Sequence, residues 1–171
     1  SLANRTNPVT VLSCDNLVEN GTTLQKAVAD FATAADLKIN WKDASFPNSM
    51  VDRITPATTD AIRAISDDPM AVPTEAFREW VIEDNFSGPC PKWPEVQFVR
   101  DVQPHELRKL RMLNGAHSLL AYAGLAQGYT YVHEAISDPA LRSQVQQLMI
   151  DAGTTLPIAV RDQVPGYAKA L

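Results

Sequence analysis

The sequence of 171 residues lacks the features that mark several large functional classes. Basic residues are in deficit, because 15 Lys and Arg face 20 Asp and Glu for a formal net charge of −5, and no Lys/Arg-rich run occurs. The electrostatic footprint of a nucleic-acid-binding protein is therefore absent. The most apolar stretch, Leu119 to Leu125, is far shorter than the ~20 apolar residues of a membrane span, and no signal peptide opens the chain. We expect a cytoplasmic protein with neither a nucleic-acid nor a membrane partner.

Cysteine and glycine are also scarce. Cys14 and Cys90 are too far apart for a CxxC metal or redox motif, so we expect two structural cysteines, no disulfide and no metal site. None of the seven glycines is spaced as GxG, so the sequence carries neither a dinucleotide-binding finger nor a P-loop.

The N-terminal half has the pattern of an α/β segment. The β-branched run VTVLS (9–13) predicts a buried strand of a parallel sheet that ends in a loop. After a turn at Asn20-Gly21, Thr22 or Thr23 can cap a helix that reaches about Leu37. A strand, a loop and a helix therefore open the chain.

Three further elements are expected before the middle of the chain. Proline stands near both ends of the segment 46–56, which predicts a short extended stretch, and a helix follows from Thr58 to Ser66. The segment FREWVIEDNF (77–86) fits either a strand or a short helix, because its hydrophobic period is ambiguous.

The composition changes at the segment 87–94, which holds three prolines and predicts a loop or a boundary. The chain after it looks helical. Pro104 opens a long helix from His105 to about Gln127, Pro139 opens another to about Gly153, and a third starts after Val164-Pro165-Gly166. The predicted fold is thus an α/β portion over residues 1–98 followed by a mainly α-helical domain over residues 99–171.

Four polar residues interrupt the otherwise apolar long helix: Glu106, Lys109, Asn114 and His117. At about 100° per residue, with Lys109 at zero, Glu106 lies near 60°, His117 near 80° and Asn114 near 140°. All four are therefore predicted to share one face and to line one pocket. The alternative is structural: a solvated lysine, a surface glutamate and a packed core histidine.

The chemistry of these four residues suits the oxidation of an alcohol. A lysine beside an apolar wall can act as a general base, because burial disfavours its charged form. An asparagine amide can stabilise a developing alkoxide without a change of charge, and a histidine can orient the same oxygen.

The pattern Lys109-x4-Asn114-x2-His117, within HELRKLRMLNGAHSLLAYAG, resembles the signature of the long-chain mannitol dehydrogenase family. That family includes mannitol 2-dehydrogenases, fructuronate reductases and tagaturonate reductases. The segments VLSCDNLVENG (11–21), FPNSMVDRITP (46–56) and FREWVIEDNF (77–86) resemble other blocks of the family, in the family's order.

The resemblance implies an organisation. Residues 1–98 would be the C-terminal part of a Rossmann-type dinucleotide-binding domain, and residues 99–171 would begin an all-helical catalytic domain. The chain then looks like the middle of a longer enzyme, without the N-terminal Rossmann half that carries the glycine-rich finger.

The resemblance also implies an activity: zinc-independent, NAD-dependent interconversion of a secondary alcohol and a ketone on a polyol or a hexuronate, with NADP left open. The pairs D-mannitol/D-fructose and D-mannonate/D-fructuronate are the candidate substrates. Lys109 would be the general base, Asn16 and Asn114 would hold the alkoxide, and His117 would position the reacting oxygen.

Three further roles follow from the resemblance. Asp52 would bind substrate, Glu106 would pass protons between the lysine and water, and Ser13 together with Asn16 would contact the cofactor. For Asp52 an ion pair with a neighbouring arginine such as Arg53 is an equal alternative.

Substrate choice and catalysis itself stay open at this level. A uronate needs a cationic partner, for which Arg53, Arg108 and Arg111 are candidates. Arg108 and Arg111 lie opposite the polar face on the helical wheel, so we expect them in solvent or at an interface. The alternative function is a non-catalytic helical binding or scaffold module that lacks the cofactor domain.

Overall fold

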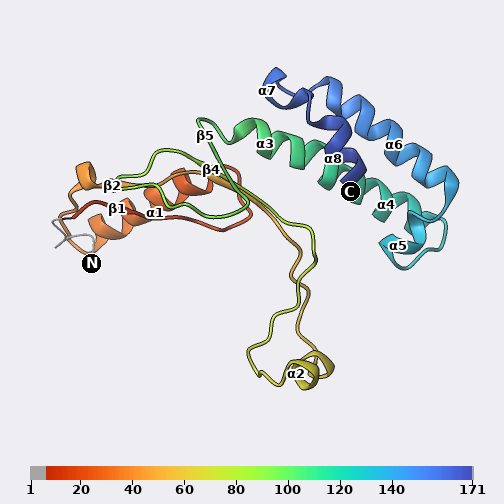
Figure 1. The fold of residues 1–171 in the computed structure, drawn as a ribbon, viewed down its shortest axis with the longest axis horizontal. Helices are drawn as coiled ribbons and strands as arrows, with labels where there is room; N and C mark the ends of the chain where they lie inside the picture. Colours follow the sequence, from red (N-terminus) through yellow and green to blue (C-terminus); the bar gives the residue numbers. More distant parts are fainter. Residues whose placement is uncertain (1–6, 171) are drawn as a thin grey trace. The chain divides into compact units, whose positions relative to one another are not determined.

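Among the described residues, the first part of the chain contains strands and helices, and the part after it contains helices alone. The computed structural model describes residues 7–170, in which every strand lies before residue 100 (Figure 1). The chain divides into two units, Ser1–Val102 and Gln103–Leu171. The boundary predicted at residue 98 lies within the last strand, β5 (Val96–Val99).

Two small sheets form the frame of the N-terminal unit. Strand β1 (Val9–Thr10) pairs in parallel with β2 (Ala44–Ser45), which follows the short helix η2 (Trp41–Asp43). The second sheet has the order β3-β4-β5, in which β3 (Ser49–Asp52) runs antiparallel to β4 (Glu79–Glu83) and β5 runs parallel to β4. Its buried cluster consists of Met50, Val81 and Val102, with Val99 packed against it.

The structure confirms that strands form in the predicted segments, but their lengths and number differ from the prediction. The predicted parallel strand over 9–13 is present, but only Val9–Thr10 form it. The ambiguous segment 77–86 contains strand β4, whose Val81 and Ile82 are fully buried. The expectation that only helices follow the proline-rich segment is wrong, because the alternating run VQFV adds to the sheet as β5.

Helix α1 (Asn20–Ala34) begins earlier than predicted. Its N-cap is Glu19 in the left-handed conformation, with a φ of 51°, so the predicted cap at Thr22 or Thr23 is wrong. The backbone N–H of Thr22 instead donates to Asn48 Oδ1 at 2.9 Å. Gly21 lies buried in the first turn, where a Cβ would stand 2.3 Å from the carbonyl oxygen of Pro47. Only glycine lets the helix approach that backbone so closely.

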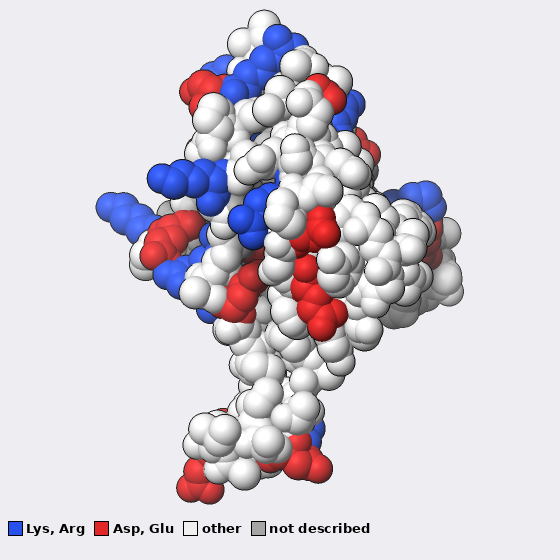
Figure 2. Space-filling view, turned by 90° about the vertical axis from the view of Figure 1, so that its right-hand side faces the viewer, with Lys and Arg blue, Asp and Glu red and all other residues white. Residues whose placement is uncertain are grey.

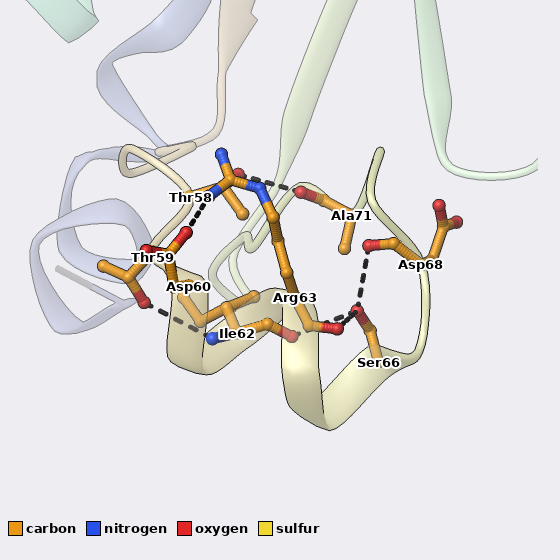
Figure 3. Close-up of polar contacts among 8 residues, drawn as sticks. All are labelled: Thr58, Thr59, Asp60, Ile62, Arg63, Ser66, Asp68 and Ala71. Carbon is orange, nitrogen blue, oxygen red and sulfur yellow. Dashed lines mark hydrogen bonds and ion pairs between the residues drawn. The ribbon is translucent and has the colours of Figure 1, made fainter.

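An arm, residues 53–78, connects the paired ends of β3 and β4 and carries helix α2 (Asp60–Ser66) at its far end (Figure 1). This confirms the helix predicted over 58–66. Figure 3 shows how its ends are held: Thr59 Oγ1 accepts from the Ile62 N–H at 3.4 Å, and Arg63 pairs with Asp60 at 2.7 Å. None of its residues is buried. In Figure 2 the arm is the lower projection, largely uncharged with acidic side chains near its tip.

The C-terminal unit is helical throughout. One long helix is made of α3 (Gln103–Arg108), a π-helical segment η3 (Lys109–Asn114) and α4 (Gly115–Ala126). The remaining helices are α5 (Val132–Ala135), α6 (Pro139–Thr154), α7 (Ile158–Arg161) and α8 (Val164–Ala170). The three predicted helices are present, and Pro139 stands in the first turn of α6 as expected. The third helix, α8, begins at Val164 and includes Val164-Pro165-Gly166, so the prediction that it starts after them is wrong.

The core of this unit comes from a stripe on the long helix and its neighbours. Met112, Ala116 and Leu120 recur every four residues and are 0%, 4% and 5% exposed. Other buried apolar residues come from α6, from the turn after it, and from α7 and α8: Leu141, Val145, Met149, Leu156, Val160 and Tyr167. Among the described residues, no helix is long and apolar enough to cross a membrane.

Candidate functional site

The loop that carries Asn16 is held by a buried asparagine. Asn20 is 1% exposed, and its Nδ2 donates to the carbonyls of Ser13 and Asp15 at 3.2 and 2.9 Å and to Ser49 Oγ at 3.1 Å. Its Oδ1 accepts from the Ser49 N–H at 2.8 Å. The loop between β1 and α1 is thereby fixed to β3, with Asn16 exposed on it.

Ser13 takes part in the same network through its backbone. Its carbonyl also accepts from Ser49 Oγ at 2.7 Å, and its Oγ accepts from the Asp15 N–H at 3.2 Å. The sequence predicted Ser13 as a cofactor contact but missed Asn20, because an Asn-Gly pair ordinarily indicates a turn. Only the fold brings Asn20 against Ser49, 29 residues away.

Asp52 ends strand β3 and is 5% exposed. It lines a cavity of about 270 Å³ together with Cys14, Arg78 and Trp80. Trp80 stacks on Trp93 with ring centroids 5.3 Å apart. Asn16 lies in the loop that follows β1, and Asp52 is the last residue of β3.

Two arginines that line this cavity are bound to other residues. Arg78 is bound to Glu95 by an ion pair, and Arg53 donates from Nε to the carbonyl of Glu75 at 3.3 Å. Arg53, the residue weighed as a partner for Asp52, is exposed at the base of the arm.

The helical unit carries the other four predicted residues. Glu106 and Lys109 are buried, at 8% and 9% exposure, which is rare for both residue types. Asn114 is half-buried and His117 is exposed. Within residues 7–170, neither the Asn114 amide nor the His117 ring makes a hydrogen bond to the protein, so both are available to a ligand.

The π-helical segment changes the predicted angles. The hydrogen bonds of a π-helix join residues five apart, so Asn114 stands to Lys109 as the fourth following residue does in an α-helix. With Lys109 at zero, Asn114 then lies at about 40°, His117 at about −20° and Glu106 at about 60°. The arc that spans the four residues is about 80°, against about 140° in the regular helix that the sequence predicted.

His117 also borders a cavity of about 390 Å³ within the helical unit. Most of its lining is apolar, including Leu113, Ala116 and Leu120 of the long helix, and Arg142 of α6 also lines it.

The sequence predicted Arg108 and Arg111 in solvent or at an interface, but the structure buries Arg108 within the helical unit. Arg108 is 3% exposed, hydrogen-bonds Gln163 through Nη1 and lies over the Tyr167 ring at 4.3 Å. Arg111 Nη1 donates to the carbonyl and to Oγ1 of Thr155 at 2.6 and 2.9 Å. Both guanidinium groups bind the segment that follows α6. No sequence pattern predicted these contacts.

Shifted carboxyl pKa values in the helical unit belong to helix N-termini. The Leu141 N–H, the Tyr129 hydroxyl and the Ala140 N–H hold the pKa of Asp138 below its usual range. The Tyr131 and Thr130 N–H groups lower the pKa of Glu134 in the same way. These shifts mark caps rather than a catalytic centre.

The described residues contain no group of three or more His, Cys, Asp or Glu side chains that could hold a metal ion. Cys14 and Cys90 are free and exposed.

Comparison with known proteins settles the family. A family model described as the mannitol dehydrogenase Rossmann domain matches residues 2–95, and one described as the mannitol dehydrogenase C-terminal domain matches residues 101–171. The chain belongs to the mannitol dehydrogenase family. Its fold is a Rossmann-type domain followed by a mainly helical domain, which confirms the fold class predicted from the sequence.

Named relatives agree with the family models. D-mannonate oxidoreductase of Escherichia coli is 43% identical over 174 residues, which cover 95% of this chain and 36% of that relative. Mannitol 2-dehydrogenase of Phaeosphaeria nodorum is 40% identical over 156 residues, 83% of this chain and 28% of that relative. The solved ternary complex of Pseudomonas fluorescens mannitol 2-dehydrogenase with NAD and D-mannitol matches 95% of this chain and 36% of that one, with a TM-score of 0.72 and 37% identity. The chain thus spans about a third of the length of these family members.

Proposed function

We propose that this protein is a zinc-independent, NAD-dependent oxidoreductase that interconverts a secondary alcohol and a ketone on a polyol or a hexuronate. The observation that carries the proposal is the helical face of Lys109, Asn114 and His117, found in a chain of the mannitol dehydrogenase family. Lysine, asparagine and histidine on one face supply a base, a neutral donor and an orienting group, which together suit alcohol oxidation.

In the direction of oxidation, Lys109 acts as the general base. Its Nζ takes the hydroxyl proton of the substrate as the C–H bond breaks. The amide groups of Asn16 and Asn114 donate hydrogen bonds to the oxygen while it carries alkoxide charge, and His117 holds that oxygen in place. In ketone reduction the same lysine returns the proton to the oxygen.

Two buried carboxylates complete the proposal. Glu106 lies one helical turn before Lys109 and passes protons between the lysine and water. Asp52 accepts hydrogen bonds from substrate hydroxyls at the edge of its cavity, since a carboxylate offers acceptors alone.

The residues after β1 fit the reactive end of a nicotinamide cofactor. Ser13 and the exposed Asn16 both lie in the loop after the parallel strand β1, and Asn20 fixes this loop. Bound NAD would accept the hydride that leaves the alcohol carbon. Ser13 and Asn16 would orient the cofactor, and Asn16 would also donate to the substrate oxygen.

For the substrate, we propose either D-mannitol/D-fructose or D-mannonate/D-fructuronate, because relatives are named for mannitol and for D-mannonate. A hexuronate requires a cation for its carboxylate. Arg108 and Arg111 are bound to Gln163, Tyr167 and Thr155. Arg53 is exposed and lines the same cavity as Asp52, so of the three arginines considered we propose Arg53 for that role.

The test is consumption of NADH by the protein at its natural length, offered D-fructose, D-fructuronate and D-tagaturonate in parallel, with the 171-residue chain beside it. Turnover of one of these ketoses supports the proposal and identifies the substrate. Binding of NADH without turnover of any of the three would favour another polyol. A folded protein that neither binds NADH nor turns over any sugar would refute the proposal and favour a non-catalytic binding module.

A further inference from the structure

The long helix of the C-terminal unit contains one residue more than its regular geometry accommodates. In η3 the bonding pattern changes from four to five residues, and the Gly115 N–H donates to the carbonyl of Leu110. Such a π turn equals the insertion of one residue into an α-helix, with regular helix on both sides. Leu110 is 50% exposed, so the added side chain fills no space in the core.

The π turn determines where Lys109 lies relative to the core. Measured from Ala116 in the core stripe, a regular helix would place Lys109 at about 20°, among the residues that pack inward. With one residue absorbed by the turn, Lys109 lies at about 120°, beside His117 at about 100° and Asn114 at about 160°. The extra residue therefore moves Lys109 from the core stripe to the polar face.

Two arginines bind this turn to the chain that follows α6. Arg111, within the turn, donates twice to Thr155, and Arg108, directly before it, binds Gln163 and lies over Tyr167. A π turn is rare and costs free energy, so it persists only where its surroundings hold it. Of the two arginines, only Arg111 belongs to the π-helical turn itself.

We propose that the π turn Lys109–Asn114 is a positioning element that brings Lys109 onto the face of Asn114 and His117, and that Arg111 is its positioning residue. The proposal rests on the proposed function, in which Lys109 is the general base. Arg111 touches neither the substrate nor the cofactor in this account; it acts by holding the turn against Thr155.

A pair of single-residue deletions tests the turn independently of catalysis. Deleting Leu110 from the natural-length protein should close the π turn into a regular helix and keep both flanks in register, so the melting temperature should stay near that of the parent. The matched control deletes Tyr122, which is 80% exposed in the regular helix α4, where the deletion rotates every later residue and should lower the melting temperature sharply. If the two deletions destabilise the protein equally, the turn does not absorb a residue and the proposal is wrong.

Substitutions of Arg111 and Thr155 test whether their contact positions Lys109. Arg111→Met should lower kcat for ketone reduction by roughly tenfold with the KM for NADH unchanged, because it removes a charge-assisted hydrogen-bond donor. Thr155→Val keeps the carbonyl acceptor, so its kcat should fall less than that of Arg111→Met. Arg111→Lys can still donate to one acceptor, so its kcat should lie between those of Arg111→Met and the parent. An unchanged kcat in Arg111→Met would overturn the role of Arg111, and equal losses of kcat and cofactor affinity would show a general structural defect instead. If the parent protein turns over no sugar, the proposed function fails, while the two deletions still decide whether the turn absorbs a residue.

Discussion

Asn16, in the loop after β1, and Asn20, the first residue of α1, are four residues apart and have opposite surroundings. Asn20 is buried and makes hydrogen bonds that tie the loop to β3, whereas Asn16 is exposed on that loop. Because both residues are asparagines, residue type does not distinguish the structural role of Asn20 from the role proposed for Asn16. Each substitution therefore serves as the control for the other.

Asn20→Ala should destabilise the N-terminal unit. The substitution leaves the Ser49 N–H and the carbonyl of Asp15 without their partner in a buried place, at a cost of about 1–3 kcal/mol for an unsatisfied group. Denaturant unfolding measures the loss, and Asn16→Ala, at an exposed position, is expected to lower the midpoint less. Equal unfolding midpoints for Asn20→Ala and the parent would contradict the claim that Asn20 stabilises the loop against β3.

Asn16→Ala should instead depress turnover. A donor to the alkoxide acts in the transition state, so we expect a loss of about 10²–10³ in kcat, with a smaller effect on the dissociation constant of NADH. Steady-state kinetics and a fluorescence titration with NADH separate the two effects. A change confined to NADH binding would rule out Asn16 as a donor to the substrate oxygen.

At the scale of elements, sequence patterns identified most helices and strands but not their departures from regular geometry. The strand at 9–13, the helix at 58–66 and the long helix at 105–127 are all present. A helical wheel assumes 3.6 residues per turn, so it placed the polar residues on one face but spread Asn114 too far from Lys109. Only the hydrogen-bond pattern reveals the π turn, because no local residue type specifies it.

The N-terminus of α6 gives a pH dependence at this scale. Hydrogen bonds from the Leu141 N–H, the Tyr129 hydroxyl and the Ala140 N–H lower the pKa of Asp138 in the folded protein. A carboxyl with a lowered folded pKa stabilises the fold above its unfolded pKa, and this contribution is lost as the pH falls through the folded value, from about pH 4 downward.

Asp138→Asn should therefore weaken the dependence of stability on acid. Asparagine still caps a helix, so the variant should remain folded near neutral pH, while its free energy of unfolding should fall less steeply than the parent's below about pH 4. Denaturant unfolding at a series of pH values checks this, and Tyr129→Phe, which removes one donor, should give a smaller change. Parallel curves for Asp138→Asn and the parent would contradict the account.

At the scale of the whole molecule, the ordered motifs were more informative than composition. Four blocks in the family's order pointed to the mannitol dehydrogenase family, and the family models cover residues 2–95 and 101–171. Contacts between residues far apart in sequence were not predictable in the same way. Arg108 on Tyr167 and Asn20 on Ser49 both depend on packing that joins segments with no shared local pattern.

The central claim is that Lys109 is the base for alcohol and ketone interconversion. The most direct measurement is the turnover of the natural-length protein and its Lys109→Ala variant with the ketose that the parent reduces, with Lys26→Ala as the control. Lys26 is an exposed lysine paired with Asp30 on α1, so its loss should leave turnover unchanged. The account predicts that Lys109→Ala loses about 10²–10⁴ in turnover, as for a missing general base. Turnover by Lys109→Ala near that of the parent would contradict it.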